Sequence, residues 1–173
     1  MSEEVVDPAA AQAFLSLYRQ ALPEVYGYLV RRCGEVAVAE DLTSETFLAA
    51  VRALKQGDVV TIGVPWLIGV ARHKLADHWR ARARDDRLQG ALEEEHVGEE
   101  DPWDVTLDRL RATDVLCRLG DHHRAALTLR YVDGLPVPEV ATLLERTVHA
   151  TEALLVRARN AFRHAYEEGE LGA

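Results

Sequence analysis

The chain has 173 residues, of which 48% are hydrophobic and 28% are charged, a balance typical of a soluble protein with one ordinary domain or two small ones. No apolar run approaches the roughly 20 residues that span a bilayer, and the acidic N-terminus lacks the basic start of a signal peptide. A formal net charge of −9 argues against a protein that binds DNA tightly by itself. We therefore expect a cytoplasmic protein without membrane insertion.

The first part of the chain is predicted to form two helices, because its apolar residues recur at helical spacing. Phe14 belongs to the first helix. Pro23 is expected to begin the second, since proline is tolerated in the first turn of a helix and breaks its interior. Gly34 is expected to end it, because glycine readily adopts the left-handed backbone of a helix stop.

A longer helix is predicted from about residue 38 to residue 54. Its buried apolar residues are expected to be Leu42, Phe47, Ala50, Val51 and Leu54. The helix carries Asp41 and Glu45 four residues apart on one face, and like charges at this spacing destabilise an isolated helix by roughly 0.2–0.5 kcal/mol. The pair therefore marks either a solvated face or a surface that meets a basic partner.

A loop over residues 55–64 leads to a helix predicted from residue 65 to about residue 87, which combines cations with flat rings. The cations are Arg72, Lys74, Arg80, Arg82, Arg84 and Arg87, and the rings are those of Trp66, His73, His78 and Trp79. Cations hold phosphates and flat side chains stabilise unstacked bases, so this helix favours nucleic-acid binding. The alternative is a basic solvated face with both tryptophans in the core, and we expect a core position for Trp66 and for Trp79.

The acidity of the chain is concentrated between residues 88 and 105, which hold seven acidic and no basic side chains. Because this stretch is also interrupted by Pro102, we interpret residues 89–105 as an acidic flexible linker. The linker would join a domain over residues 1–88 to a second domain over residues 106–173. The predicted fold class is all-α, with two small helical domains.

Residues 121–163 are predicted to form three helices separated by short breaks, the last two at helix-turn-helix spacing. Asp121 is expected to cap the first of these helices and Gly134 to end it. The second covers residues 135–144, and Thr147 is expected to cap the third.

The third helix carries Arg157, Arg159 and Arg163 in its far half. In a helix-turn-helix motif the second helix of the pair enters the major groove, where basic residues along it contact phosphates. A helical hairpin that serves only for packing has the same local pattern.

Three blocks, over residues 39–54, 65–82 and 121–163, together resemble the extracytoplasmic-function group of bacterial RNA polymerase sigma factors, the two-domain members of the sigma-70 family. The likeness depends on the order and spacing of the blocks. It implies that residues 1–88 are sigma domain two and residues 106–173 sigma domain four. It also implies binding to core RNA polymerase, recognition of the minus-10 and minus-35 promoter elements, DNA melting, and an anti-sigma factor as inhibitory partner.

The resemblance assigns three surfaces. Asp41, Leu42 and Glu45 match the polymerase-binding positions that dock on the coiled coil of the β′ subunit, with the β flap as a further contact of the enzyme. The minus-10 positions are Arg72, His73, Lys74, Asp77, His78, Arg80 and Arg82. The minus-35 positions are Thr151, Glu152, Leu154, Arg157 and Arg159.

The chain departs from the family pattern at several of these positions. His73 stands where asparagine is common. Glu145 replaces the glycine usual in the helix-turn-helix turn, which implies a strained or altered turn. Glu152 and Leu154 stand where the family has basic residues. Glu152 either accepts a hydrogen bond from a cytosine amino group or repels phosphate, and both readings stay open.

Neither a phosphate-binding glycine loop nor a nucleophile motif nor clustered metal ligands appear in the sequence, so we expect no enzyme, no metal and no cofactor. Cys33 and Cys117 lack metal-ligand spacing and are expected to be thiols. Two rival functions are an ordinary helix-turn-helix regulator and a sigma-like interaction module that has lost DNA recognition. Copurification with core polymerase separates the regulator from a sigma factor, and promoter-dependent transcription excludes the module.

Overall fold

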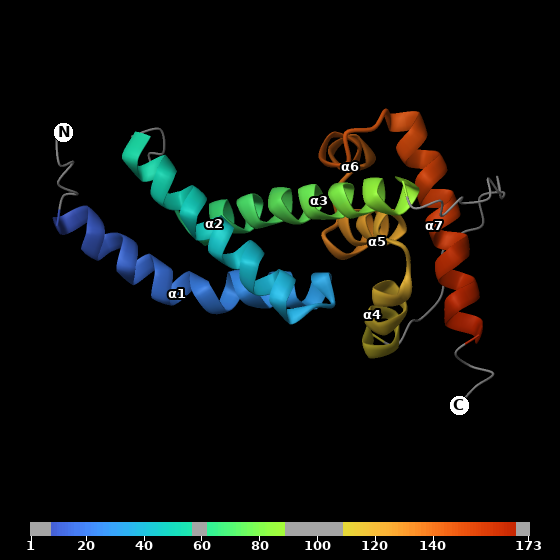
Figure 1. The fold of residues 1–173 in the computed structure, drawn as a ribbon, viewed down its shortest axis with the longest axis horizontal. Coiled ribbons are helices and arrows are strands. Elements are labelled where there is room, and N and C mark those ends of the chain that lie inside the picture. Colours follow the sequence, from blue (N-terminus) through green and yellow to red (C-terminus); the bar gives the residue numbers. More distant parts are fainter. Residues whose placement is uncertain (1–7, 57–61, 89–108, 169–173) are drawn as a thin grey trace. The chain divides into compact units, whose positions relative to one another are not determined.

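The computed structural model describes residues 8–56, 62–88 and 109–168, and all secondary structure in these ranges is helical (Figure 1). The helices are α1 (Pro8–Cys33), α2 (Val36–Gln56), α3 (Val64–Leu88), α4 (Arg109–Arg118), α5 (Asp121–Leu127), the π-helix η1 (Thr128–Val132), α6 (Val137–Leu143) and α7 (Val148–Glu168). This confirms the all-α fold class. The predicted linker, residues 89–105, lies outside the described residues.

The chain divides into two compact units, and the boundary between Leu75 and Ala76 falls inside α3. The first unit holds α1, α2 and the beginning of α3. The second holds the rest of α3 together with α4, α5, η1, α6 and α7. Each unit has its own buried apolar side chains, as expected of a compact folding unit.

α1 is one continuous helix, so the expected break at Pro23 is wrong. The helix continues because Ala21, Val25 and Leu29, on both sides of the proline, are fully buried, while Pro23 itself is exposed. An interior proline costs a helix about 3 kcal/mol, which burial of this apolar face offsets. Gly34, with φ +73°, ends the helix as predicted.

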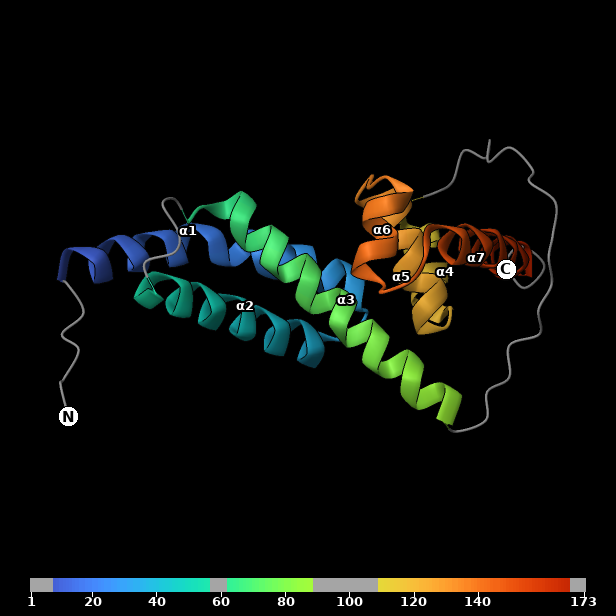
Figure 2. The ribbon, with the colours of Figure 1, turned by 90° about the horizontal axis from the view of Figure 1, so that it is seen from above.

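α1 and α2 lie side by side and form the main packing of the first unit (Figure 2). The Tyr18 ring of α1 meets the Phe47 ring of α2 edge to face, with 4.7 Å between centroids. Thr46, although polar, is buried in α2 because its hydroxyl donates to the Leu42 carbonyl at 2.7 Å. Leu54 was expected in the core, but it lies at the end of α2 and is exposed.

α3 contributes core residues at a spacing of four to both units. Leu67, Ala71 and Leu75 are fully buried in the first unit, and Trp79 and Ala83 are buried in the second. The expectation that the tryptophans are core residues is confirmed for Trp79, whereas Trp66 is half-buried.

The second unit links α4 to α5 through a buried arginine. Arg124 of α5 donates its Nε hydrogen to the Leu116 carbonyl at 3.0 Å and also hydrogen-bonds the Cys117 carbonyl. These carbonyls belong to the last turn of α4, whose acceptors have no partner within the helix. A cation at this end also suits the negative pole of the helix dipole.

Candidate nucleic-acid and polymerase interface

The polymerase-binding residues expected on α2 separate into exposed and buried positions. Asp41 and Glu45 are exposed, and Leu48, one turn further on, is 53% exposed. We call Asp41, Glu45 and Leu48 the acidic stripe. Leu42 is only 6% exposed, so its expected place in a binding surface is corrected: its side chain packs in the core and fixes the orientation of α2. Sequence reasoning missed Leu48, although it follows Glu45 by three positions and therefore shares its face.

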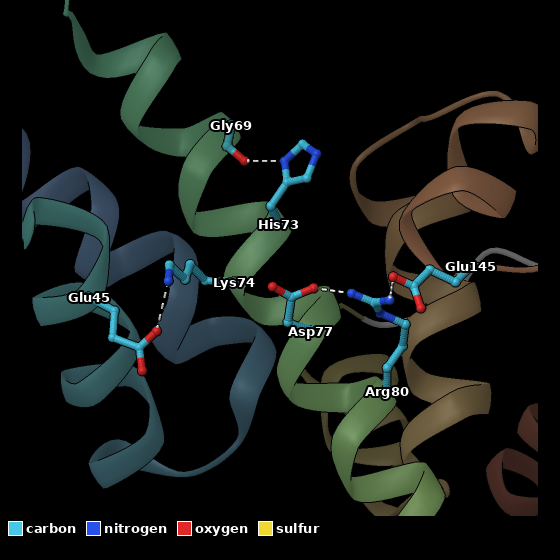
Figure 3. A network of polar contacts seen from close by, with 7 residues as sticks. All are labelled: Glu45, Gly69, His73, Lys74, Asp77, Arg80 and Glu145. Atoms are coloured by element: carbon cyan, nitrogen blue, oxygen red, sulfur yellow. Dashed lines mark hydrogen bonds and ion pairs between the residues drawn. The ribbon is translucent and has the colours of Figure 1, made fainter. Parts of the chain in front are cut away.

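Glu45 is already engaged within the first unit. Its Oε2 lies 3.1 Å from Nζ of Lys74 on α3, and both side chains are partly exposed (Figure 3). Sequence reasoning placed these two residues in different surfaces, one for polymerase and one for DNA. The ion pair brings them together and relieves part of the repulsion between Glu45 and Asp41.

His73 lies on the exposed side of α3, and its ring is oriented by the helix backbone. Its Nδ1 is 2.9 Å from the carbonyl oxygen of Gly69, one turn earlier (Figure 3). A carbonyl only accepts, so Nδ1 must carry the proton and donate. In the neutral ring Nε2 is then left as an acceptor that faces outward.

The remaining residues expected to contact minus-10 DNA lie around α3 and do not form a single face. Asp77 and Arg82 are exposed, as His73 is. Arg72, His78 and Arg80 are half-buried.

Two arginines at the end of α3 are paired with carboxylates of the second unit. Arg80 contacts Asp77 on its own helix and Glu145 in the helix-turn-helix turn (Figure 3). Arg82 Nε lies 3.0 Å from Oδ2 of Asp121. The structure thus gives Arg80 and Arg82 internal anionic partners.

Asp121 does not cap α5, which corrects the sequence expectation. Gly120 occupies the N-cap position, no side-chain cap bond forms, and Asp121 is the first residue of the helix. Its carboxylate is buried and pairs with Arg82. A negative charge there is favoured by the positive end of the helix dipole.

The helix-turn-helix consists of α6, a short turn and α7. Pro138 lies in the first turn of α6. Thr147 caps α7 by accepting from the Ala150 N–H at 3.1 Å, as expected. Glu145 has φ +51°, the one positive φ of a non-glycine residue in the described ranges. The strained turn inferred from the missing glycine is therefore present.

Two of the expected minus-35 residues are in the core. Thr151 is fully buried, and its hydroxyl donates to the Thr147 carbonyl at 2.9 Å. Leu154 is 1% exposed. Neither side chain is available to DNA, so both assignments are corrected to packing roles.

The exposed side of α7 near its start presents residues that sequence reasoning did not select. Val148 and His149 are exposed together with Glu152, which was expected. Their exposure could have been predicted from the sequence, because Leu154, Ala158 and Phe162 recur at a spacing of four and form the buried face of α7. Positions 148, 149 and 152 lie off that face.

Arg157 and Arg159 are half-buried on α7. Arg159 donates to the phenol oxygen of Tyr131 at 2.9 Å, and Tyr131 is itself exposed at the end of η1. The hydrogen bond orients the Arg159 guanidinium. Tyr131 is a further residue that the sequence did not suggest, because it is 28 positions away from Arg159.

Across the part of the chain that the structure describes, histidine, cysteine, aspartate and glutamate side chains form no group of three or more able to hold a metal ion. Within the same ranges, none of the helices is long and apolar enough to cross a membrane.

Comparison with family models matches the two halves of the chain in order. The model for Sigma-70 region 2 matches residues 17–85, and that for Sigma-70 region 4 matches residues 109–162. The region 2 match covers most of α1, all of α2 and nearly all of α3, and the region 4 match covers α4 to most of α7.

Individual relatives agree with these matches. The chain is 36% identical over 155 residues to the ECF RNA polymerase sigma factor BldN of Streptomyces coelicolor, covering 86% of this chain but 58% of BldN. It is 33% identical over 159 residues to the ECF RNA polymerase sigma factor SigL of Mycobacterium tuberculosis, covering 87% of this chain and 89% of SigL. Among solved structures, the sigma factor RpoE of Bartonella quintana, crystallised with the anti-sigma factor NepR, aligns with a TM-score of 0.53 at 19% identity, over 90% of this chain and 98% of RpoE. On the evidence of both family matches and the SigL relationship, the chain belongs to the extracytoplasmic-function group of sigma-70 family RNA polymerase sigma factors.

Proposed function

We propose that this chain directs core RNA polymerase to promoters through the acidic stripe, the exposed side of α3 and the groove-facing side of α7. The observation that carries the proposal is that one chain holds all three parts in the family order. A simple helix-turn-helix regulator needs only the last part. The sigma reading therefore accounts for more of the chain.

The acidic stripe would bind the coiled coil of the β′ subunit. Asp41 and Glu45 present two carboxylates, and Leu48 adds apolar area beside them. Since Lys74 neutralises part of this charge, a basic partner surface must compete with Lys74 for Glu45. Charge complementarity of this kind sets partner choice and association rate more than raw affinity.

The exposed side of α3 would hold the minus-10 element as separated strands. The outward-facing Nε2 of neutral His73 can accept from an amino group on an unpaired base. Opening a base costs a few kcal/mol, so contacts made only after opening lower the free energy of the melted state. Arg80 and Arg82 would supply phosphate contacts.

α7 would enter the major groove at the minus-35 element. Arg157 and Arg159 would contact phosphates, with Tyr131 orienting Arg159. Val148, His149 and Glu152 would face base edges, where Glu152 can accept from the amino group of cytosine. Thr151 and Leu154 would hold the helix in place from within the core.

The chain would act without catalysis of its own and in the cytoplasm, where core polymerase synthesises RNA. An anti-sigma protein is the expected inhibitor. Its class follows by analogy with the RpoE–NepR complex, in which the fold of a sigma factor is bound by such a protein. A partner that covers the acidic stripe would block polymerase binding.

Run-off transcription with purified core enzyme on sheared genomic DNA, followed by mapping of start sites, tests the proposed function. We expect discrete transcripts that depend on the chain. Tight sequence-specific DNA binding by the free protein, without transcripts in the presence of core enzyme, would instead favour a regulator. Core binding without transcripts would favour the interaction module.

A separate test on the mapped promoter distinguishes the proposed role of α3 in strand opening from that of α7 in recruitment. Arg80→Ala with Arg82→Ala should impair strand opening, so a template already mismatched at the minus-10 element should restore part of the activity. Arg157→Ala with Arg159→Ala should weaken recruitment, which a preopened bubble does not replace. Equal rescue of both double variants would contradict this division.

A further inference from the structure

A cleft of about 300 Å³ lies in the second unit, where the end of α3, α5 and the turn before α7 line it. Its floor is apolar and includes the buried side chains of Trp79, Ala83 and Leu144. Protein interiors have few voids larger than a water molecule, and sites for small molecules begin at about 300 Å³. The cleft therefore has the size of a small-ligand site.

Three arginines line this cleft from two elements. Arg80 and Arg84 are four residues apart on α3, so they lie on the same face of the helix. Like charges at this spacing repel each other, and an anion beside them relieves the repulsion. Arg146, half-buried in the turn before α7, adds a third guanidinium. Neither Arg84 nor Arg146 has a role in the proposed contacts with polymerase or promoter DNA.

Two of these arginines are held in place by the surrounding structure. The guanidinium of Arg80 contacts Asp77 on its own helix and Glu145 in the turn (Figure 3). The backbone that carries the Arg146 side chain is fixed, because its N–H donates to the Ala141 carbonyl at 2.9 Å. Side chains ordered before binding lose less conformational entropy when a ligand arrives.

The charge of the lining favours a doubly charged anion. Three arginines against Glu145, the acidic residue of the lining, leave a surplus of two positive charges. A phosphate monoester carries a charge of about −1.5 to −2 at pH 7, whereas a carboxylate carries only one negative charge. The planar guanidinium also matches phosphate oxygens with two parallel hydrogen bonds. The apolar floor adds a requirement for a ligand with an apolar or aromatic body.

We propose that this cleft binds a small phosphate monoester with an aromatic body, the class to which nucleoside monophosphates belong. Arg84 and Arg146 hold the phosphate, Arg80 adds positive charge beside it, and the body of the ligand covers the apolar floor. The site gives the chain a small-molecule ligand in addition to its macromolecular partners. It depends on neither the polymerase contact nor the promoter contact of the proposed function.

Isothermal titration calorimetry of the free full-length chain with AMP, GMP, CMP and UMP tests the proposal. At least one of these should bind with a Kd of about 1 mM or tighter. The matching nucleoside and inorganic phosphate should each bind at least about tenfold more weakly, because each fills only one part of the cleft. The proposal is overturned if no nucleotide binds, or if inorganic phosphate binds as tightly as the best nucleotide.

Arg84→Gln and Arg146→Gln should each weaken nucleotide binding about tenfold, the loss expected for a hydrogen bond to a charged group. Arg118→Gln is the matched control, because Arg118 is an exposed arginine on α4 that pairs with Asp114 and does not line the cleft. It removes the same charge and should leave nucleotide binding unchanged. Circular dichroism checks that all three variants are folded. An equal loss in the control would show that only the net charge matters and would contradict the site.

A nucleic-acid backbone is the other source of phosphate, and a single-stranded ten-nucleotide DNA without a terminal phosphate distinguishes it. Its phosphodiesters carry one charge each and are joined to neighbours that the cleft has no room to enclose. Arg84→Gln and Arg146→Gln should therefore weaken DNA binding no more than Arg118→Gln does. A larger loss would identify the cleft as a site for nucleic-acid backbone and overturn the proposal. These titrations contain no polymerase, so their failure leaves the proposed function untouched.

Discussion

Replacing Leu154 by alanine distinguishes the sequence-based view of α7 from the structure. The sequence places Leu154 among residues that contact DNA, whereas the structure buries it to 1% exposure. The substitution removes three buried carbon groups, worth about 0.8 kcal/mol each, or about 2.4 kcal/mol together. The cavity left behind raises the expected loss of unfolding free energy to about 2–5 kcal/mol.

The lost transfer free energy of about 2.4 kcal/mol corresponds by itself to a fall in Tm of about 10–20 °C, at roughly 4–8 °C per kcal/mol for a domain of this size. Thermal unfolding of the full chain, followed by circular dichroism, measures it. Glu152→Ala on the exposed side of α7 is the control and should stay within about 0.5 kcal/mol of the parent. A Leu154→Ala chain that melts with the parent but loses promoter binding would show that the side chain faces DNA.

Three further substitutions test other contacts. Asp41→Lys with Glu45→Lys should reduce core-polymerase affinity at least tenfold in a titration, with an unchanged circular dichroism spectrum because both residues are exposed. Glu145→Ala and Glu145→Gly both lose the contact with Arg80, but only alanine keeps the left-handed strain. The alanine variant should therefore be about 1 kcal/mol less stable to urea than the glycine variant. Equal stability of the two variants would argue against strain at this turn. Tyr131→Phe removes the hydrogen bond that orients Arg159, so run-off transcription should fall up to about fivefold at an unchanged Tm.

The helices of the chain could be predicted from sequence because periodicity, caps and stops agree with one another. Thr147 caps α7, and Gly34 and Gly134, with φ of +73° and +71°, end helical segments as expected. Pro23 was misjudged because its cost is local, while the packing that offsets it depends on α2, which follows in the chain. Asp121 was misjudged for the same reason, since its partner Arg82 lies far away in sequence.

The candidate site could be predicted by position but not by exposure. A family motif names a residue without stating whether its side chain faces outward, so Leu42, Thr151 and Leu154 were assigned to surfaces although they are buried. Leu154 could have been recognised from its spacing to Ala158 and Phe162. Tyr131 could not, because contact with Arg159 depends on how η1 packs near α7.

We expect the free chain to bind DNA weakly, for two reasons that differ in where the charge lies. A net charge of −9 repels phosphate from a distance, and this repulsion is screened beyond about 8 Å at physiological salt. Carboxylates in contact with Arg80 and Arg82 act at short range, where salt screens them far less. Raising the salt concentration should therefore remove the first effect and leave the second. Measuring how the affinity of the free chain for DNA varies with salt concentration therefore separates the two effects.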